Sequence, residues 1–328
     1  MDRTEQALHA IDLSGRGLEF GPSHAPLVTK ASGARVETLD HATREELVQK
    51  YRALGVDEES LARIEEVDHL WSGEPVLELI PEHGVYDYIV ASHFIEHTVD
   101  LVRFLQDCET LLAPGGRLAL IVPDKRFCFD RFQPLSTAGD AINTLHSTLA
   151  FHPPGAFIDH IAYGAKRGDD VAWANSDSRE VALLNPDLMD AVQAELDGVA
   201  QREYVDTHRW MFTPSSFELL IHDLAALGHH GLGIVESSTA GGHEFFVTLG
   251  RDVPPREIDR LGLLLRIEAE LADVGPGGPF DTAKPEAVHG EIRRLEAEVA
   301  ALRASTSWRM TRPLRAVAGL LGRGRTRR

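Results

Sequence analysis

Leu18-Glu19-Phe20-Gly21-Pro22-Ser23 and, further along, Val36-Glu37-Thr38-Leu39-Asp40 are the two stretches that decide the fold of this chain. Both are short apolar runs, the first ending in a Gly-Pro turn and the second in an acid, as in the opening of a nucleotide-binding βαβ unit. Glycine lets the backbone pass close to a ligand at a strand end, and a carboxylate about 20 residues later can hold ribose hydroxyls. We therefore predict a ligand site that includes Glu19, Gly21, Ser23 and Asp40.

A strand, a helix and another strand are predicted between residues 85 and 123. Residues 85–91 form an apolar run of β-forming residues, as expected for a strand buried on both faces. Apolar residues recur at helical spacing from Val99 to Leu112. Pro114-Gly115-Gly116 then ends the helix, and a second apolar strand begins.

These segments resemble, in the same order, the motifs of class I S-adenosylmethionine-dependent methyltransferases. The resemblance covers residues 18–123 and rests on Leu-Glu-Phe-Gly-Pro, on Ser-His-x-Ile-Glu-His from Ser92 and on Leu-x-Pro-Gly-Gly-Arg-Leu from Leu112. It implies an α/β fold with a Rossmann-like, seven-stranded sheet and helices on both faces, and S-adenosylmethionine as cofactor. It also implies that Ser92 and His93 line the cofactor pocket and that Asp68, near the end of a short third strand over residues 66–71, meets the adenine.

His93-Phe94-Ile95-Glu96-His97 also fits H-x-x-E-H, the signature of inverted zinc peptidases. In that class, two histidines four residues apart on one helix bind zinc and the glutamate activates water. Here the motif directly follows a buried strand within the ordered methyltransferase motifs, and no third ligand is marked. A zinc hydrolase is therefore the weaker alternative.

Four segments are predicted along the chain: a cofactor-binding half over 1–123, an insertion over 124–211, the rest of the methyltransferase domain over 212–252 and a helical extension over 253–328. Ligands of open α/β sheets bind outside the carboxyl ends of the strands, so we expect the insertion to cap the acceptor. Residues 182–204 within it are helix-like. Thr213 is the expected N-cap of the next helix, and residues 232–237 and 244–249 are expected to form a final antiparallel hairpin.

The candidates for catalysis lie in the insertion. A methyltransferase must align its acceptor with the methyl group and, for a hydroxyl acceptor, take up the proton. Histidine and carboxylate side chains suit that role, and Asp124, Asp159, His160 and His208 are the candidates. Together with Asp130 they are also metal-ligand types, but their spacing defines no site and no metal is assigned.

The bulk composition excludes several classes of protein. With 328 residues, 43% hydrophobic and 26% charged, the chain has the composition of an ordinary globular protein. A formal net charge of −18 argues against broad nucleic-acid binding. Cys108 and Cys128 make no disulfide framework, which favours a reducing cytoplasm and a packing role for both. Neither a membrane-spanning run nor a signal peptide is recognisable.

The C-terminal extension contains two further patterns. Between residues 286 and 303, apolar residues step by four and three, which predicts either a self-associating helix that makes a homo-oligomer or a helix folded back on the domain. Residues 303–328 contain eight arginines and no acid. Ser305–Arg315 resembles the closing segment of bacterial surface-polysaccharide glycosyltransferases. That resemblance implies a sugar or glycan acceptor, and the basic tail is expected either to contact a glycosyltransferase or an anionic membrane surface, or to be disordered.

The sequence therefore predicts a cytoplasmic methyltransferase, peripheral at the inner face of the membrane, that O-methylates a sugar or glycan in surface-polysaccharide biosynthesis. A small-molecule acceptor or a nitrogen acceptor is an alternative within the same fold. A non-catalytic scaffold for glycan assembly is another, because Ser23 stands where the family has glycine.

Overall fold

The computed structural model describes residues 2–72, 74–147, 151–187, 192, 207–239, 242–254 and 257–272. The chain divides into two units, Met1–Pro276 and Gly277–Arg328, and every described residue belongs to the first. The predicted heptad helix and basic tail lie outside the described residues, so what the sequence predicts for them stays a prediction. None of the described helices has the length and apolar character that crossing a membrane demands.

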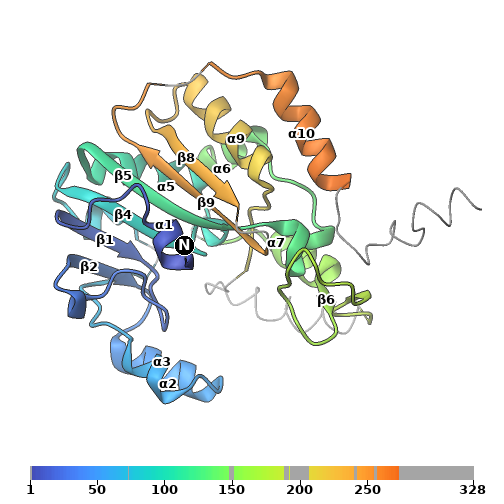
Figure 1. Cartoon of the computed structure of the whole chain (residues 1–328), viewed down its shortest axis with the longest axis horizontal. Helices are drawn as coiled ribbons and strands as arrows, with labels where there is room; N and C mark the ends of the chain where they lie inside the picture. The colour runs from blue at the N-terminus through green and yellow to red at the C-terminus, as the bar shows by residue number, and fades with distance from the viewer. Residues whose placement is uncertain are drawn as a thin grey trace, which may run out of the picture. The chain divides into compact units, whose positions relative to one another are not determined.

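A seven-stranded sheet forms the centre of the first unit (Figure 1). In spatial order its strands are β3 (His69–Leu70), β2 (Arg35–Asp40), β1 (Arg16–Phe20), β4 (Tyr86–Ser92), β5 (Leu112–Pro123), β9 (Glu244–Gly250) and β8 (Gly233–Thr239). Strands β1 to β5 pair in parallel, whereas β9 is antiparallel to both β5 and β8. The predicted α/β sheet and its final antiparallel hairpin are confirmed. The order reverses between β1 and β4, which is where ligands bind in open parallel sheets.

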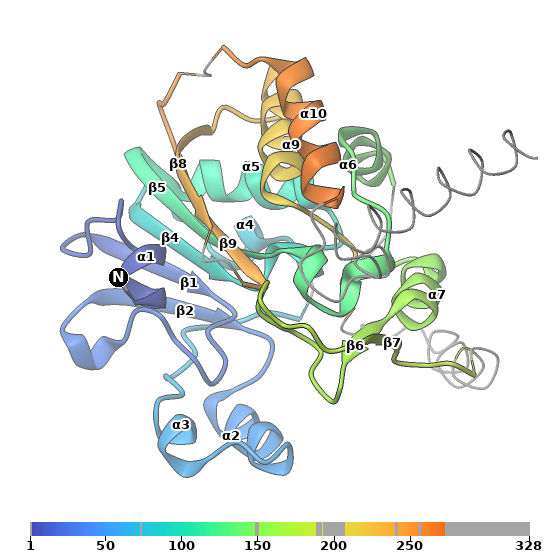
Figure 2. The same cartoon turned by 45° about the vertical axis from the view of Figure 1, so that its right-hand side comes forward.

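Helices cover both faces of this sheet because its strands are apolar on both sides. Ile89 and Ala91 of β4 pack on one face in a core that includes α5 (Leu101–Leu111) and α9 (Pro214–Ala226). Tyr88 and Val90 point to the other face, where Ala7 of α1 (Arg3–Ala7) packs. Figures 1 and 2 show α5 and α9 together on one side of the sheet. The remaining elements of this half are η1 (Lys30–Ser32), α2 (Arg44–Ala53), α3 (Glu58–Ala62), α4 (Val76–Leu79) and η2 (Ile95–His97).

The insertion after β5 forms its own small elements. These are η3 (Lys125–Phe127), η4 (Phe129–Phe132), α6 (Ala138–Leu145), α7 (Pro154–Tyr163), β6 (Ala165–Arg167) and β7 (Val181–Leu183). Strands β6 and β7 pair with each other in a separate two-stranded sheet. Figure 2 shows α7, β6 and β7 grouped beyond the carboxyl end of β5. The insertion therefore lies at the sheet edge where a ligand is expected.

Three local predictions need correction or refinement. The third strand is two residues long rather than six, and Asp68 precedes it instead of ending it. Ala182 and Leu183, predicted as the start of a helix, belong to β7, and most of the predicted helix lies outside the described residues. Helix α10 (Arg260–Ala272) belongs to the first unit, and Glu270 accepts a hydrogen bond from Ser215 Oγ of α9 at 2.7 Å.

Candidate active site

A cavity of about 570 Å³ lies at the carboxyl ends of β1, β2 and β4. Its volume is within the range of sites for small-molecule ligands. The loops after these strands form its wall, together with residues of α1 and α2 and the aromatic residue after β3. The lining residues are Arg3, Glu19, Gly21, Pro22, Ser23, His24, Ala25, Asp40, His41, Lys50, Tyr51, Trp71, Ser92, His93, Phe94 and His97. Six of the seven predicted cofactor residues are among them.

Glu19 shapes the floor of this cavity from inside β1. Its two carboxylate oxygens accept hydrogen bonds from the backbone N–H groups of Leu27 at 2.8 Å and Val28 at 3.1 Å. Burial raises the pKa of Glu19 to about 7, against the smaller opposing effect of these two hydrogen bonds. Glu19 therefore holds the loop after β1 in place. Gly21 begins that loop at φ +59°, a conformation that glycine adopts without strain.

Asp40 ends β2 and is buried beside the same loop. Its Oδ2 accepts a hydrogen bond from Ser23 N at 3.0 Å, and its Oδ1 accepts one from His41 N at 2.8 Å. His41 Nδ1 donates a second bond to Oδ1 at 2.7 Å, and Lys50 Nζ lies 3.1 Å from the other ring nitrogen. Ser23 has φ +50°, so a serine adopts the left-handed backbone here and turns its N–H toward Asp40.

Asp68 is not one of the lining residues. Its Oδ2 accepts hydrogen bonds from Thr38 N at 2.8 Å and from Lys30 Nζ at 2.7 Å. Trp71, one residue after β3, lies in the cavity wall instead, and its ring centroid is 6.0 Å from that of Phe94. The short strand explains the difference, because the residue that leaves its carboxyl end is Trp71.

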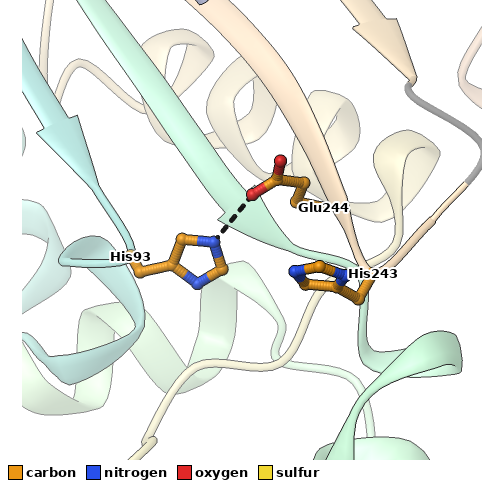
Figure 3. A group of neighbouring side chains, drawn as sticks. All are labelled: His93, His243 and Glu244. Atoms are coloured by element: carbon orange, nitrogen blue, oxygen red, sulfur yellow. Dashed lines mark hydrogen bonds and ion pairs between the residues drawn. The ribbon is translucent and has the colours of Figure 1, made fainter. Parts of the chain in front are cut away.

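His93, the residue after β4, lies in the cavity wall and pairs with Glu244 (Figure 3). His93 Nε2 donates to Glu244 Oε2 at 2.9 Å, and Arg3 binds the same carboxylate at 2.8 and 3.0 Å. Burial acts to lower the pKa of His93, but its contacts with Glu244 and Glu96 outweigh it and raise the pKa to about 9. Burial acts to raise the pKa of Glu244, and His93 and Arg3 bring it down to about 2. His93 is therefore a cation at neutral pH.

Sequence reasoning did not find Arg3, Glu244 or Trp71. Arg3 lies in the first helix and Glu244 opens β9, so only the pairing of β9 with β5 brings them to the end of β4. No local motif marks either residue. The aromatic residue after the short strand was a usable signal for Trp71.

A second cavity, of about 310 Å³, is formed mainly by the insertion. Asp159 and His208, both predicted catalytic residues, line it, and burial raises the pKa of Asp159. The other lining residues are Gln133, Pro134, Leu135, Ser136, Asp140, Pro153, Gly155, Ala156, Arg209, Trp210 and Met211. The rings of His208 and His97 are in edge contact, with centroids 4.5 Å apart, and His97 lines the first cavity. This pair of histidines therefore forms a wall between the two cavities.

The other two predicted catalytic residues are placed differently. The His160 ring packs against Phe129 at 5.3 Å and lies 6.5 Å from the His208 ring, measured between centroids. Asp124 binds Arg126 through both carboxylate oxygens, at 2.9 and 2.6 Å, and lines neither of the two cavities. Its geometry is that of a buried ion pair that holds the start of η3, and it lends no support to a catalytic role.

The H-x-x-E-H segment does not form the helix that a zinc peptidase needs. His93 has φ +49° and its side chain binds Glu244, while residues 95–97 form the single turn η2. His93 and His97 therefore do not share one face of a helix with Glu96 between them.

A model of the methyltransferase domain family matches residues 1–224, which is more than half of the chain. A search of curated protein sequences finds no match. Among solved structures, an S-adenosylmethionine-dependent methyltransferase from Mesorhizobium loti is 14% identical, with 76% of this chain and 98% of that one covered and a TM-score of 0.38.

Two further structures show the same degree of likeness. An S-adenosylmethionine-dependent methyltransferase from Thermotoga maritima is 12% identical, with 76% and 87% of the two chains covered and a TM-score of 0.37. A Rhodobacter sphaeroides protein named as a zinc-dependent alcohol dehydrogenase is 12% identical, with 77% and 91% covered and a TM-score of 0.41. Likenesses this weak say nothing about acceptor or reaction, and the family match over residues 1–224 carries the assignment.

The residues of the first cavity fit S-adenosylmethionine. The cofactor needs a hydrogen-bond acceptor for its ribose hydroxyls, and the Asp40 carboxylate at the end of β2 could act as that acceptor. It needs an apolar wall for its base, and Trp71 and Phe94 supply aromatic surface. Arg3 and Ser92, which are joined by a hydrogen bond of 3.1 Å, are polar lining residues that could bind its methionine end. The chain belongs to the methyltransferase domain family and is an S-adenosylmethionine-dependent methyltransferase.

Proposed function

We propose that this enzyme transfers the methyl group to a hydroxyl of a sugar or glycan. The observation that carries the proposal is the second cavity, which is separated from the cofactor cavity by the contacting rings of His97 and His208. A sugar presents several hydroxyls, each both a donor and an acceptor of hydrogen bonds. Asp159, Gln133 and Arg209 line the second cavity with matching acceptors and donors.

In this proposal, the residues of each cavity have separate tasks. Bound S-adenosylmethionine supplies an electrophilic methyl group. Asp40 holds the ribose hydroxyls, and Trp71 flanks the base. Asp159 orients the acceptor hydroxyl and takes up its proton, and its raised pKa makes it a stronger base than an exposed aspartate. His208 lines the same cavity and positions the acceptor, and His160 lies behind it, packed against Phe129.

The test is an acceptor screen with isotopically labelled S-adenosylmethionine. Monosaccharides, nucleotide sugars and lipid-linked oligosaccharides are compared with amines and phenols, and the methylated product is identified by mass spectrometry. We expect transfer to a sugar hydroxyl, and we expect Asp159→Asn to lower kcat about 100-fold, as loss of a general base does. Asp170→Asn is the matched control, because the exposed Asp170 carboxylate of the insertion pairs with Arg179 at 2.6 Å and lines neither cavity.

Two outcomes would contradict the proposal. Transfer only to amines or to phenols would establish one of the other acceptors. No binding of S-adenosylmethionine by the folded protein would favour the non-catalytic scaffold, and Ser23 would be the first residue to replace with glycine.

Because a sugar acceptor is proposed, we also propose a role for the C-terminal extension. We propose that residues 286–303 form a homo-oligomer and that residues 303–328 hold the enzyme near glycosyltransferases at the inner face of the membrane. Only sequence supports these two proposals: the apolar heptad spacing and the eight arginines without an acid.

A further inference from the structure

Three side chains of metal-ligand type converge at the wall between the two cavities. One ligand atom from each of Glu96, His97 and His208 lies within 4.8 Å of the other two. Glu96 Oε1 is 3.9 Å from His97 Nε2 and 3.9 Å from His208 Nε2. Glu96 and His97 come from η2, whereas His208 comes from the end of the insertion. The backbone fixes this approach, because Arg209 N donates to Glu96 O at 2.8 Å.

The Glu96 carboxylate is completely buried, with 0% of the residue exposed. Neither of its oxygens has a hydrogen-bond partner among the described residues. Its nearest charged neighbour is His93 Nδ1, at 3.5 Å from Oε1, and His93 already binds Glu244 through its other nitrogen. A buried carboxylate without hydrogen bonds is strongly destabilising unless a cation compensates it. The His93 cation, which is shared with Glu244, compensates part of this buried charge, and a bound metal cation would compensate the rest.

The orientation of His208 suits a metal ligand. Its Nδ1 donates to the buried carboxylate of Asp130 at 2.6 Å, and Asp130 in turn accepts a bond from Gln133 Nε2 at 2.8 Å. This contact puts the ring proton on Nδ1 and leaves the lone pair of Nε2 directed toward Glu96. Carboxylate, histidine and metal in sequence are the usual second-sphere arrangement of protein metal sites.

We propose that Glu96, His97 and His208 bind a divalent transition-metal ion. Two imidazoles and one carboxylate, with at least one open position, are a ligand set used by zinc and by other first-row metals. Ligand atoms at about 2.1 Å from a tetrahedral ion lie roughly 3.4 Å apart. The observed 3.9 Å separations thus require a small inward shift when the ion binds. The ion would lie between the cofactor cavity, lined by His97, and the second cavity, lined by His208.

A second group of ligand type, drawn in Figure 3, lacks these properties. His93, His243 and Glu244 also bring three ligand atoms within 4.8 Å of one another. The Glu244 carboxylate, however, is already hydrogen-bonded to Arg3 and to His93, so two protein cations compensate it. His243 therefore provides the matched control for the proposed site.

The experiment uses the full-length protein, stripped with a chelator and dialysed against Zn²⁺. We expect about one zinc ion per chain by elemental analysis, and Co²⁺ in its place should give visible absorption bands of a site with nitrogen and oxygen ligands. Glu96→Gln and His208→Ala should lower zinc affinity at least 10-fold. Asp130→Asn should lower it about 10- to 100-fold, as loss of a second-sphere carboxylate does. His243→Ala should leave it unchanged.

Circular dichroism and calorimetric binding of S-adenosylmethionine verify that each variant is folded. Failure of the wild-type protein to bind zinc at micromolar concentration would overturn the proposal. So would full affinity in His208→Ala, or loss of the ion in His243→Ala. Zinc binding is measured without any acceptor. Its outcome therefore tests the metal site alone, and the acceptor screen tests the proposed sugar methylation.

Discussion

Two buried acids, Glu19 and Asp40, stand side by side in the cofactor cavity but act differently. Each oxygen of Glu19 accepts a backbone N–H of the loop after β1, so Glu19 holds that loop in place. Asp40 accepts bonds from Ser23 N and His41, and a carboxylate has about four acceptor positions, so it keeps capacity for a ligand. Both carboxylates thus hold the loop after β1, and Asp40 is the one that we expect to bind the cofactor as well.

Asp40→Ala should weaken binding of S-adenosylmethionine by about 1 kcal/mol or more, because a charge-assisted hydrogen bond to the ribose is lost. Isothermal titration calorimetry measures the change. Asp68→Ala is the matched control, since Asp68 lies near the same sheet edge but outside the cavity wall. Equal losses in the two variants would show that the cofactor does not contact Asp40.

Glu19 makes stability depend on pH in a predictable direction. Its pKa is about 7 in the folded protein and about 4.5 when the chain is unfolded. A raised folded-state pKa stabilises the fold fully below about pH 4.5, and that contribution is lost as the pH rises through 7. Between about pH 5 and 8, the free energy of unfolding of the wild type should therefore fall by about 1–3 kcal/mol relative to Glu19→Gln.

Urea unfolding of both proteins without ligand, at several pH values, measures that difference. Comparing the two proteins cancels the titration of the histidines, which occurs in the same range. Parallel pH profiles for the wild type and Glu19→Gln would mean that Glu19 remains ionised in the fold.

At the scale of elements, α9 shows how local sequence sets a boundary. Thr213 Oγ1 accepts from Ser216 N at 3.4 Å, and Ser216 Oγ accepts from Thr213 N at 2.8 Å, so the first turn is capped in both directions. Pro214 follows at the first helical position, where its missing N–H is not needed. These three residues suffice to predict the start of the helix, and the structure confirms it.

Thr213→Ala should destabilise the protein by about 1 kcal/mol, because Ser216 N loses its side-chain acceptor at a buried helix end. The free energy of unfolding in urea gives the value. Thr213→Ser keeps the cap oxygen and removes only a methyl group, so it should be clearly milder. If both substitutions cost the same, packing of the methyl group and not capping is what Thr213 contributes.

The insertion is less predictable from sequence than α9. Its local sequence does not reveal which groups its charged side chains contact. Its charged residues suggested a cap, and they include Asp159 and His208 of the second cavity. They also include Asp124, whose partner is Arg126 two residues away. Residue type alone cannot separate a carboxylate that faces a cavity from one that is neutralised by a neighbouring arginine.

At the scale of the whole molecule, the chain divides at residue 276 and not at 252. Helix α10 contacts α9 through Glu270 and Ser215, and Arg126 Nη1 donates to the Glu270 backbone at 3.2 Å. The extension predicted from residue 253 therefore begins with a helix that belongs to the first unit.

A protein truncated after Pro276 should fold and bind S-adenosylmethionine as tightly as the full chain, because every described residue of both cavities is retained. Circular dichroism and calorimetry test this. Sedimentation of the two proteins then tests the proposed homo-oligomer, which predicts a fall in mass beyond that of the removed residues. An unchanged oligomeric state would place any self-association outside residues 277–328.

Sequence alone determined the features that depend on near neighbours: the apolar strands, the Gly-Pro turn, the stripe of α5 and the N-cap of α9. Such features follow from periodicity and turn chemistry within about a dozen residues. Only the tertiary structure decided that Arg3 and Glu244 meet His93, that His208 meets Glu96, and that Trp71 takes the place expected for Asp68. The first two depend on the antiparallel entry of β9 beside β5 and on the path of the insertion. Those are properties of strand order and packing, which leave no local pattern in the chain.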